Sequence, residues 1–370
     1  MDAVSKVSPY YQQLLGRGSL VREDRETSSY LSQQRILVTG AGGSVGSALS
    51  SILLRLRPRS LTLVEHHENS IFQLRQHLSD QIKESGVPVE FVLADVRDIR
   101  TISGVFRSTQ PEVIFHLAAY KHVPLAEECP EQFVSVNVVG TWHLCQEALR
   151  AGVKQVIYPS TDKAVNPPSV YGATKRSVEL LCEALASEQT GEYVGENMRT
   201  RFNVARLVNV LGASGGVIES FFDQIQAGNP VRVTDSRMTR YWITMDEALF
   251  LLTQATRISG SGKVVLLDMG DPINVEGIAR RLWRLVRCED GQCQIEYIGI
   301  RPGERLAEEL ARDDESLQPT LVSGLLEVSK DRLPTYSLAE AAAYVSLMEQ
   351  LIGENARERI RQELFAFVRR

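Results

Sequence analysis

The segment STDKAVNPPSVYGATK, residues 160–175, holds several side chains that can transfer protons. Tyr171 and Lys175 are four residues apart, so on a helix they lie one turn apart on the same face. A tyrosine ionises at about pH 10 in water, and a neighbouring ammonium group lowers that pKa. We therefore predict that Tyr171 accepts a proton from a substrate hydroxyl while a hydride leaves the adjoining carbon. Lys175 is also expected to hold the ribose of a nicotinamide cofactor.

A cofactor of this kind needs a phosphate-binding loop, and VTGAGGSVGSAL supplies one after the apolar run RILVTG. The loop must turn tightly, let its backbone approach a pyrophosphate and offer the first amides of a helix to the negative charge. The spacing GxxGxxG, followed by a helical pattern, meets these needs. The loop residues that we expect to bind the cofactor are Gly40, Gly43, Ser44, Val45 and Gly46.

The next two strand ends carry acidic residues. Glu65 ends the run SLTLVE, close to the position of the acid that binds the adenosine ribose. A carboxylate there repels a 2′-phosphate, and no arginine follows immediately, so NAD is favoured over NADP. Glu65 also fits a surface glutamate at a strand end. Asp95 is predicted to contact the adenine, and Val96 and Ala118 are further expected cofactor contacts.

The elements that must position these residues alternate along the chain. Short apolar runs at 35–40, 60–65, 89–95, 112–119 and 154–160 are typical of buried strands, and helical patterns separate them. This order predicts an α/β fold, a Rossmann-type doubly wound parallel sheet, because parallel strands need crossover helices that cover both faces. Further strands are expected at 200–210 and 262–270.

The pattern becomes less regular after residue 210, which predicts a second, smaller lobe. The expected parts are an N-terminal extension at 1–34, an NAD-binding domain at 35–210 with a returning strand near 263–269, a mostly helical substrate-binding lobe at 211–330, and C-terminal helices at 331–370. The last part is expected to break near Gly353 into two helices.

Composition restricts the class of protein. The 370 residues are 43% hydrophobic and 24% charged, as in ordinary globular proteins, and the net charge of −5 argues against a nucleic-acid partner. No apolar run approaches the roughly 20 residues of a membrane span, and there is no secretory signal, so a cytoplasmic location is expected. The chain has five scattered cysteines, which favours free thiols. Its six histidines all lie before residue 144, and no metal site is expected. A homo-oligomer is expected.

Together these motifs identify a resemblance to the extended short-chain dehydrogenases/reductases. More narrowly, the chain is similar to the inverting UDP-N-acetylglucosamine 4,6-dehydratases of the polysaccharide biosynthesis protein family. The matching pieces, in family order from about residue 35 to 310, are TGAGGSVGS, FHLAAYKHVPLAEECP, VNVVGT, STDKAVNPPSVYGATK, NVLG, MTRYW and IRPGERLAEEL. LLGR near the N-terminus also fits. Some family members have long N-terminal membrane regions, and this chain resembles only their catalytic part.

The resemblance implies a reaction at two positions of a nucleotide sugar. Tyr171 would deprotonate the C4 hydroxyl as hydride passes to NAD, with Thr161 aligning the C4 oxygen. The resulting ketone acidifies the C5 proton, which Lys163 would remove, while Asp162 would protonate the departing C6 hydroxyl. The product is a 4-keto-6-deoxy sugar. Two acid–base sets are needed because two different hydroxyl groups react.

Lysine at 163 carries stereochemical information. Retaining dehydratases have Asp-Glu at this pair, whereas Asp-Lys resembles the C5-inverting group. A lysine base must be partly neutral, and positive charge from Lys175, Lys121 or the bound nicotinamide is expected to make it so. Taken alone, Asp162 and Lys163 also fit an exposed, salt-bridged turn after a strand.

Five residues are expected to contact the nucleotide sugar. Lys121 and His122 follow the fourth predicted strand, and ligands bind beyond the carboxyl ends of such strands. Arg240 and Arg301 suit pyrophosphate oxygens, and Asn209 suits uracil or phosphate. Arg240 fits equally a partner for a carboxylate in the small lobe.

The chain also departs from the family pattern. Cys129-Pro130 replaces Asn-Pro, Leu207 and Val208 are bulkier than usual, and Glu219 stands where a proline is expected. The last change concerns a loop expected to cover the sugar or nucleotide. One alternative is a nucleotide-sugar 4-epimerase, which would have no work for Asp162 and Lys163. Another extended reductase acting on a different nucleotide sugar is a further alternative, and a non-catalytic dinucleotide sensor, which would not need Tyr171 and Lys175, is the last.

Overall fold

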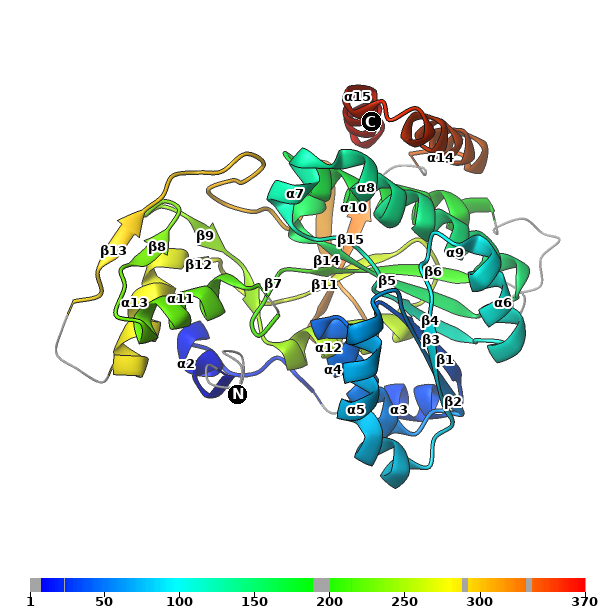
Figure 1. The fold of residues 1–370 in the computed structure, drawn as a ribbon, viewed down its shortest axis with the longest axis horizontal. Helices are drawn as coiled ribbons and strands as arrows, with labels where there is room; N and C mark the ends of the chain where they lie inside the picture. Colours follow the sequence, from blue (N-terminus) through cyan, green and yellow to red (C-terminus); the bar gives the residue numbers. More distant parts are fainter. Residues whose placement is uncertain are drawn as a thin grey trace.

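The structure, a computed structural model, describes residues 8–22, 24–188, 200–213, 215–287, 292–330 and 335–369. A nine-stranded sheet forms the centre of its larger part (Figure 1), in the order β14-β15-β11-β6-β5-β4-β1-β2-β3. The strands from β3 to β11 are parallel, and β15 and β14 follow as antiparallel neighbours. The bounds are β1 Arg35–Thr39, β2 Ser60–Glu65, β3 Val89–Leu93, β4 Val113–His116, β5 Gln155–Thr161, β6 Arg201–Leu207, β11 Val264–Leu267, β14 Glu315–Pro319 and β15 Leu325–Lys330.

Helices cover both faces of this sheet, which confirms the predicted doubly wound architecture. In Figure 1, α3, α4, α5 and α12 lie below the sheet, and α8, α9 and α10 lie above it. The C-terminal pair, α14 and α15, packs over α10 as a further layer. The bounds are α3 Arg25–Ser32, α4 Ser44–Leu56, α5 Glu68–Ser85, α6 Ile99–Thr109, α7 Val123–Glu128, α8 Pro130–Val134, η2 Ser135–Gly140, α9 Thr141–Arg150, α10 Val170–Glu188, α12 Met245–Gln254, η5 Ala255–Arg257, α14 Leu338–Gly353 and α15 Arg357–Val368.

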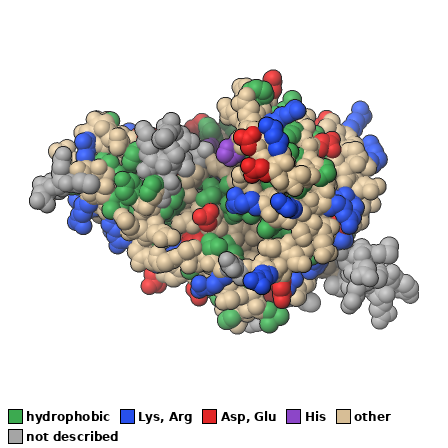
Figure 2. Space-filling view, turned by 90° about the horizontal axis from the view of Figure 1, so that it is seen from below, with side chains coloured by type: hydrophobic (Ala, Val, Ile, Leu, Met, Phe, Trp, Pro, Cys, Tyr) green, Lys and Arg blue, Asp and Glu red, His purple; other side chains and the backbone are tan. Residues whose placement is uncertain are grey.

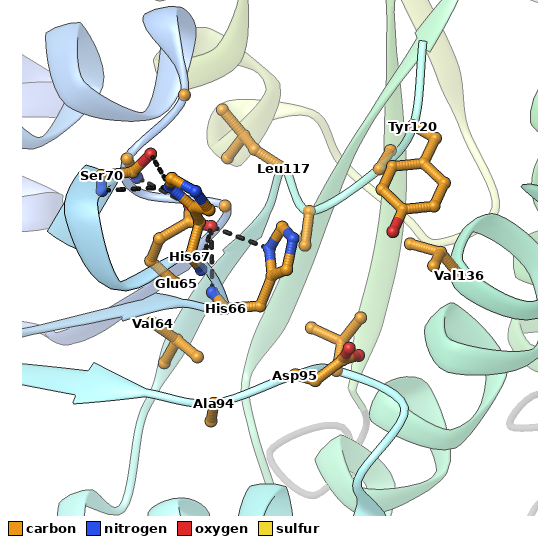
Figure 3. A pocket seen from close by; sticks show the side chains of 16 residues that line it. Val64, Glu65, His66, His67, Ser70, Ala94, Asp95, Leu117, Tyr120 and Val136 are labelled. Carbon is orange, nitrogen blue, oxygen red and sulfur yellow. Dashed lines mark hydrogen bonds and ion pairs between the residues drawn. The ribbon is translucent and has the colours of Figure 1, made fainter. Parts of the chain in front are cut away.

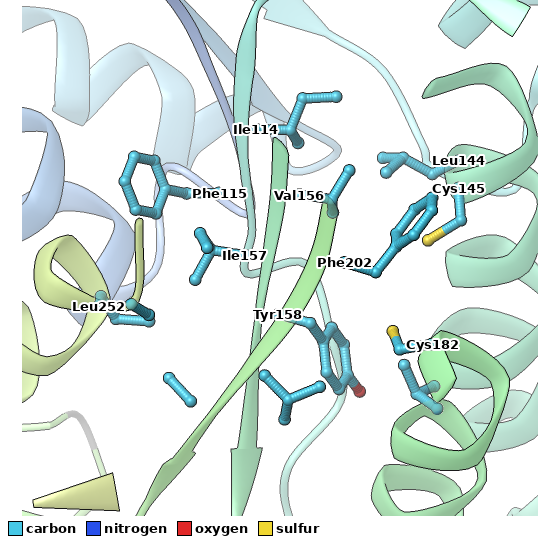
Figure 4. Packing of buried hydrophobic residues seen from close by; sticks show 14 of the residues in the cluster. Ile114, Phe115, Leu144, Cys145, Val156, Ile157, Tyr158, Cys182, Phe202 and Leu252 are labelled. Carbon is cyan, nitrogen blue, oxygen red and sulfur yellow. The ribbon is translucent and has the colours of Figure 1, made fainter. Parts of the chain in front are cut away.

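The central strands are apolar at consecutive positions because both faces are covered. Every residue of β5 is buried. Figure 4 shows Ile157 pointing to the side of Leu252 on α12, whereas Tyr158 points to the side of Cys182 on α10. Alternate residues of one strand thus fill the two cores of the sheet, and this is why the sequence lacks polar alternation in its central strands.

The smaller lobe has its own hydrophobic core. It is built from α11 (Val217–Gln226), α13 (Val275–Arg287) and three two-stranded sheets. The sheets pair β7 (Asn209–Val210) with β10 (Trp242–Ile243), β9 (Thr239–Arg240) with β12 (Ile273–Asn274), and β8 (Val231–Val233) with β13 (Ile295–Tyr297). Its core includes Phe221, Phe222, Trp242, Ile278 and Leu282.

The N-terminal extension belongs to both parts of the molecule. Helix α2 (Tyr11–Leu15), which follows η1 (Ser8–Tyr10), adds Tyr11 and Leu14 to the core of the smaller lobe. Arg17 then binds the buried Glu247 at the start of α12, with nitrogen–oxygen distances of 2.6 and 2.9 Å. The extension therefore ties the smaller lobe to a helix that covers the sheet.

The surface carries charges of both signs, and the described cysteines are not in disulfides. Basic and acidic side chains are interspersed on the face shown in Figure 2. Among the described residues, no helix combines the length and apolar character that crossing a bilayer requires. Cys129, Cys145, Cys182 and Cys293 are free thiols, and Cys288 lies outside the described residues. No cluster of three or more potential metal ligands occurs in the described part of the chain.

Candidate active site

Strand β5 leads directly into two residues that can transfer protons, Asp162 and Lys163. It ends at Thr161 and continues into the short helix η3, Asp162–Ala164. The Thr161 hydroxyl donates a hydrogen bond to Asp162 Oδ1 at 2.9 Å, and Asp162 is 1% exposed. The Lys163 amine lies 2.9 Å from the same Oδ1, and the Lys163 side chain is 22% exposed. The pair is thus an inward-facing ion pair, which excludes the exposed turn that the sequence alone also allowed.

A third charged group, Glu308, completes this cluster. Its Oε1 lies 3.7 Å from Lys163 Nζ. Burial lowers the pKa of Lys163, but the carboxylates of Asp162 and Glu308 outweigh it and raise the pKa above the usual value. The resting side chain is therefore an ammonium ion. The expectation that Lys121 and Lys175 keep this amine partly neutral is wrong, because its charged neighbours are carboxylates.

Helix α10 carries both members of the Tyr-Lys pair, as predicted. Burial raises the pKa of Tyr171 to about 12, against the lowering effects of Lys163 and of a hydrogen bond from Thr161. Burial lowers the pKa of Lys175 to about 7. Its amine donates to Pro159 O at 2.8 Å and lies 4.4 Å from the centre of the Tyr158 ring. The cation that lowers the Tyr171 pKa is thus Lys163, and not Lys175 as predicted.

Gly172 lets α10 approach the Asp-Lys turn. A Cβ atom at this position would lie 2.1 Å from Lys163 O, far closer than atoms can pack. Glu127 fixes the start of the same helix by accepting a hydrogen bond from Val170 N at 2.7 Å. We did not single out Gly172 from the sequence. The available signal was a glycine inside a helical pattern, which costs stability unless packing requires it.

Asn137 is a second residue that sequence analysis missed. It is fully buried on the π-helix η2. Its Oδ1 accepts from Tyr120 N at 2.8 Å, and its Nδ2 donates to Tyr120 O and Thr174 Oγ1, each at 3.0 Å. Asn137 therefore fixes the loop after β4 against α10. The motif VNVVGT contained the signal, but the sequence did not indicate which backbone the amide would bind.

The glycine loop between β1 and α4 has the shape of a pyrophosphate cradle. Gly40 has a φ of +64°, and a Cβ there would lie 2.7 Å from Ala118 N. A Cβ at Gly46 would lie 2.2 Å from Gly40 O. Larger residues are therefore excluded at both positions, which keeps the turn before α4 tight.

Two cavities adjoin this loop and are lined by the predicted cofactor residues of the glycine loop and of the strand ends, but not by Tyr171 or Lys175. A cavity of about 360 Å³ is lined by Gly40, Gly43, Glu65, Asp95, Val96 and Ala118 (Figure 3). A neighbouring cavity of about 520 Å³ is lined by Gly40, Gly43, Ser44, Val45 and Gly46, together with Lys121 and His122. The glycine cradle, the acid at the end of β2 and the adjoining cavities fit a dinucleotide.

Glu65 connects the glycine loop to the two residues that follow β2. Its Oε2 accepts from Gly42 N at 3.0 Å, and its Oε1 accepts from His66 N at 2.9 Å and His67 N at 3.1 Å. Figure 3 shows the carboxylate between the glycine loop and the two histidines. Asp95, on another wall, is held by Arg97 at 2.6 Å, and this hydrogen bond is the main reason why its pKa is lowered. Arg97 thus holds Asp95 in its ionised form, and three backbone amides fix the position of Glu65.

We expect Glu65→Ala to weaken NAD binding more than NADP binding. The loop loses its anchor for both cofactors, but only NAD also loses a charged hydrogen-bond acceptor, so the preference should change by about tenfold. Titration calorimetry with each dinucleotide measures this ratio. Glu68→Ala, at the first residue of α5 and exposed, is the matched control. Equal losses for the two cofactors would exclude a ribose contact.

The predicted sugar contacts fall into two groups. Lys121 and His122 line the cavity beside the glycine loop. Burial lowers the pKa of Lys121, and Glu219 opposes this effect. Asn209 donates to Tyr241 O at 3.0 Å, and Arg301 is 55% exposed and pairs with Glu304 at 2.7 Å. The structure thus brings Lys121 and His122 to the cofactor loop and turns Arg301 outward.

Arg240 lies beside the acid–base cluster. Its guanidinium donates to the carbonyls of Thr239, Arg305 and Leu306 at 2.7, 2.8 and 3.2 Å. Its Nε lies 3.8 Å from Glu308 Oε1. These contacts agree with the second possibility from the sequence, a partner for a carboxylate.

Glu219, the departure from the family pattern, has a clear structural role. It is 7% exposed at the start of α11. Its Oε1 accepts from Tyr11 Oη at 3.1 Å and from Gly212 N at 3.0 Å. The side chain therefore joins the N-terminal extension to the loop that follows β7.

Comparison with known proteins agrees with this site. The family model described as "Polysaccharide biosynthesis protein" matches residues 36–330. The chain belongs to the polysaccharide biosynthesis protein family. Apart from Arg35 at the start of β1, the Rossmann-type sheet up to β15 and the helix that carries Tyr171 and Lys175 lie within the matched residues.

Several family relatives and one solved structure are similar over most of this chain. The capsular polysaccharide biosynthesis protein CapD of Staphylococcus aureus is 40% identical over 306 residues, 82% of this chain and 49% of CapD. The chain thus spans about half the length of that relative. An inverting UDP-N-acetylglucosamine 4,6-dehydratase of Campylobacter jejuni is 30% identical over 286 residues, 76% of this chain and 79% of that enzyme. Pen from Bacillus thuringiensis superposes with a TM-score of 0.72 at 28% identity, covering 83% and 93% of the two chains.

Proposed function

We propose that this chain is an NAD-dependent nucleotide-sugar 4,6-dehydratase. Its substrate would be UDP-N-acetylglucosamine or a close relative, and its product a 4-keto-6-deoxy sugar inverted at C5, a precursor for polysaccharide synthesis. The observation that carries the proposal is the buried Asp162–Lys163 ion pair beside Tyr171. The similarity to the Campylobacter jejuni dehydratase supports it.

The residues that would hold NAD are those of the glycine loop, with Glu65 at the adenosine ribose and Lys175 toward the nicotinamide ribose. When bound, the nicotinamide would take a hydride from C4 and return it to C6. Tyr171 would accept the C4 hydroxyl proton, and Thr161 and the Lys163 ammonium are placed to lower the pKa of its phenol. The closed packing of α10 against η3 keeps these groups together.

The Asp162–Lys163 pair supplies both an acid and a base through one proton transfer. The proton moves from Lys163 Nζ to the Asp162 carboxylate, so an N–H bond breaks and an O–H bond forms. This leaves a neutral amine and a neutral carboxylic acid without changing the net charge of the pair. The amine can then remove the C5 proton, while the acid protonates the C6 oxygen, which leaves as water. An ammonium resting state is therefore compatible with a lysine base.

A nucleotide-sugar 4-epimerase is the competing function. A UDP-glucose 4-epimerase of Rickettsia akari is 27% identical over 328 residues. An epimerase would use the Tyr-Lys pair and the cofactor, but a buried acid–base pair at residues 162 and 163 would have no work. The two functions differ in whether water leaves.

Incubation with a panel of UDP- and dTDP-sugars tests the proposal. Mass spectrometry should detect the loss of one water, about 18 daltons, from UDP-N-acetylglucosamine or a related sugar. Conversion to an isomer of unchanged mass would instead identify an epimerase.

A further inference from the structure

Glu308 is a buried carboxylate that has no role in the proposed reaction. It is 7% exposed and lies in the segment that follows RPGE, far from the Asp-Lys turn in sequence. Its Oε1 is 3.7 Å from Lys163 Nζ and 3.8 Å from Arg240 Nε. Within the described part of the chain, its Oε2 and the Oδ2 of Asp162 are both buried without a hydrogen-bond partner. Unsatisfied buried oxygens are costly and point to a ligand or a transferred proton.

The backbone around Glu308 is fixed from several directions. Arg240 binds the carbonyls of Arg305 and Leu306, and Arg305 Nη1 donates to Val165 O at 3.3 Å. Gly303 has a φ of +79° and is so close to Ser169 that a Cβ would lie 2.9 Å from Ser169 Cβ. The segment is therefore tied to the stretch of chain between Lys163 and Tyr171. A side chain held in this way has one defined position relative to Lys163.

We propose that Glu308 is a positioning residue that holds the Lys163 amine beside Asp162 and controls how readily it releases its proton. This inference rests on the proposed function and deepens it. Lys163 would lie between two carboxylates, of which Asp162 exchanges the proton and Glu308 does not.

The charged groups around Lys163 explain why Asp162 exchanges the proton and Glu308 does not. Lys163 faces Asp162, Glu308 and Tyr171, and Glu308 also faces Arg240 and Arg305. Asp162 additionally interacts with Tyr241. When the Lys163 proton moves to Asp162, Glu308 keeps Arg240 as its counterion. The transfer therefore leaves no unpaired charge among these four residues. Loss of the Glu308 charge would instead leave Arg240 uncompensated and favour the neutral amine.

The titratable groups of the cluster shift one another's pKa. Burial, together with Asp162, raises the pKa of Glu308, whereas Lys163 and Arg240 lower it, and the net change is upward. The Lys163 amine has its pKa raised by both carboxylates. Each member thus depends on the other two, as expected where three charged groups share one buried site.

Competitive labelling of Lys163 with acetic anhydride over a range of pH tests the proposal. The full chain is used with NAD bound, the peptide that contains residue 163 is quantified by mass spectrometry, and the exposed Lys83 serves as internal standard. We expect Glu308→Gln to move the labelling midpoint of Lys163 down by about one pH unit or more. Glu308→Asp should keep most of the wild-type midpoint, because it retains the charge.

Glu309→Gln is the matched control, since it removes the same charge at the next position, where the side chain is 55% exposed. A midpoint that moves equally in Glu308→Gln and Glu309→Gln, or in neither, would overturn the proposal. If Glu308→Gln does not fold, Glu308→Asp decides: a midpoint that falls part of the way below wild type and Glu309→Gln, because the shorter side chain moves the carboxylate away from Lys163, supports the proposal, and a midpoint equal to theirs contradicts it. The labelling needs no turnover, so a wild-type protein that dehydrates no sugar would refute the proposed function while leaving this result interpretable.

Discussion

Replacing Lys163 by arginine should reduce water loss from the nucleotide sugar by at least about 100-fold, the usual contribution of a positioned acid–base group. Arginine keeps a positive charge between Asp162 and Glu308, so the cluster stays electrically balanced. It cannot become a neutral base, because its pKa exceeds about 12. Deuterium uptake at C5 in heavy water should disappear together with product formation.

The substitution separates the proton transfer from the electrostatics of the cluster. Binding of NAD and the melting temperature should stay near the wild-type values, because the charge is retained. Lys83→Arg on α5, 77% exposed, is the matched control and should be fully active. Normal C5 exchange in Lys163→Arg would remove this residue from the mechanism.

Gly172→Ala should have the second-largest effect. Its Cβ would lie 2.1 Å from Lys163 O, so α10 and η3 must separate. Overpacking of this kind costs about 1–3 kcal/mol of stability. A displacement of about 1 Å between reacting groups costs about 100-fold in rate, so we expect dehydration to fall by that factor even where the protein stays folded. Thermal unfolding and C5 exchange, measured on the same preparation, report the two effects.

A second helical glycine provides the control. Gly104 lies inside α6, and the nearest atom to its Cβ would be Arg107 Nη2 at 3.9 Å. Gly104→Ala should therefore be neutral or stabilise the protein by up to about 1 kcal/mol. Equal behaviour of the two alanine variants would show that the close approach of α10 to Lys163 has no functional weight.

The parallel half of the fold could be predicted because its strands, apart from the half-exposed edge strand β3, are buried on both faces. Their consecutive apolar residues leave little ambiguity, and the returning strand at β11 follows the same rule. The edge strand β14 was not predicted, and its sequence ESLQP shows why: it is exposed at most positions and pairs on one side only. Its neighbour β15, with polar residues at alternate positions, was missed for a related reason.

Some residues of the site could likewise be predicted from the sequence, and others could not. Asp162, Lys163, Tyr171 and Lys175 lie within one segment, so spacing alone placed them together. Glu308 reaches Lys163 only through tertiary packing, and RLAEEL gave no indication of which glutamate turns inward. The protonation of Lys163 could not be predicted either, because it depends on that distant carboxylate.

The fate of a label at C4 tests the central claim most directly. UDP-N-acetylglucosamine carrying deuterium at C4 should be incubated in ordinary water with the NAD-bound protein, and the product examined by NMR. The account predicts a dehydrated sugar with the deuterium at C6, because the C4 hydride returns there after water has left. Deuterium retained at C4 of a sugar that has lost no water and has the opposite configuration at C4 would contradict it and identify an epimerase.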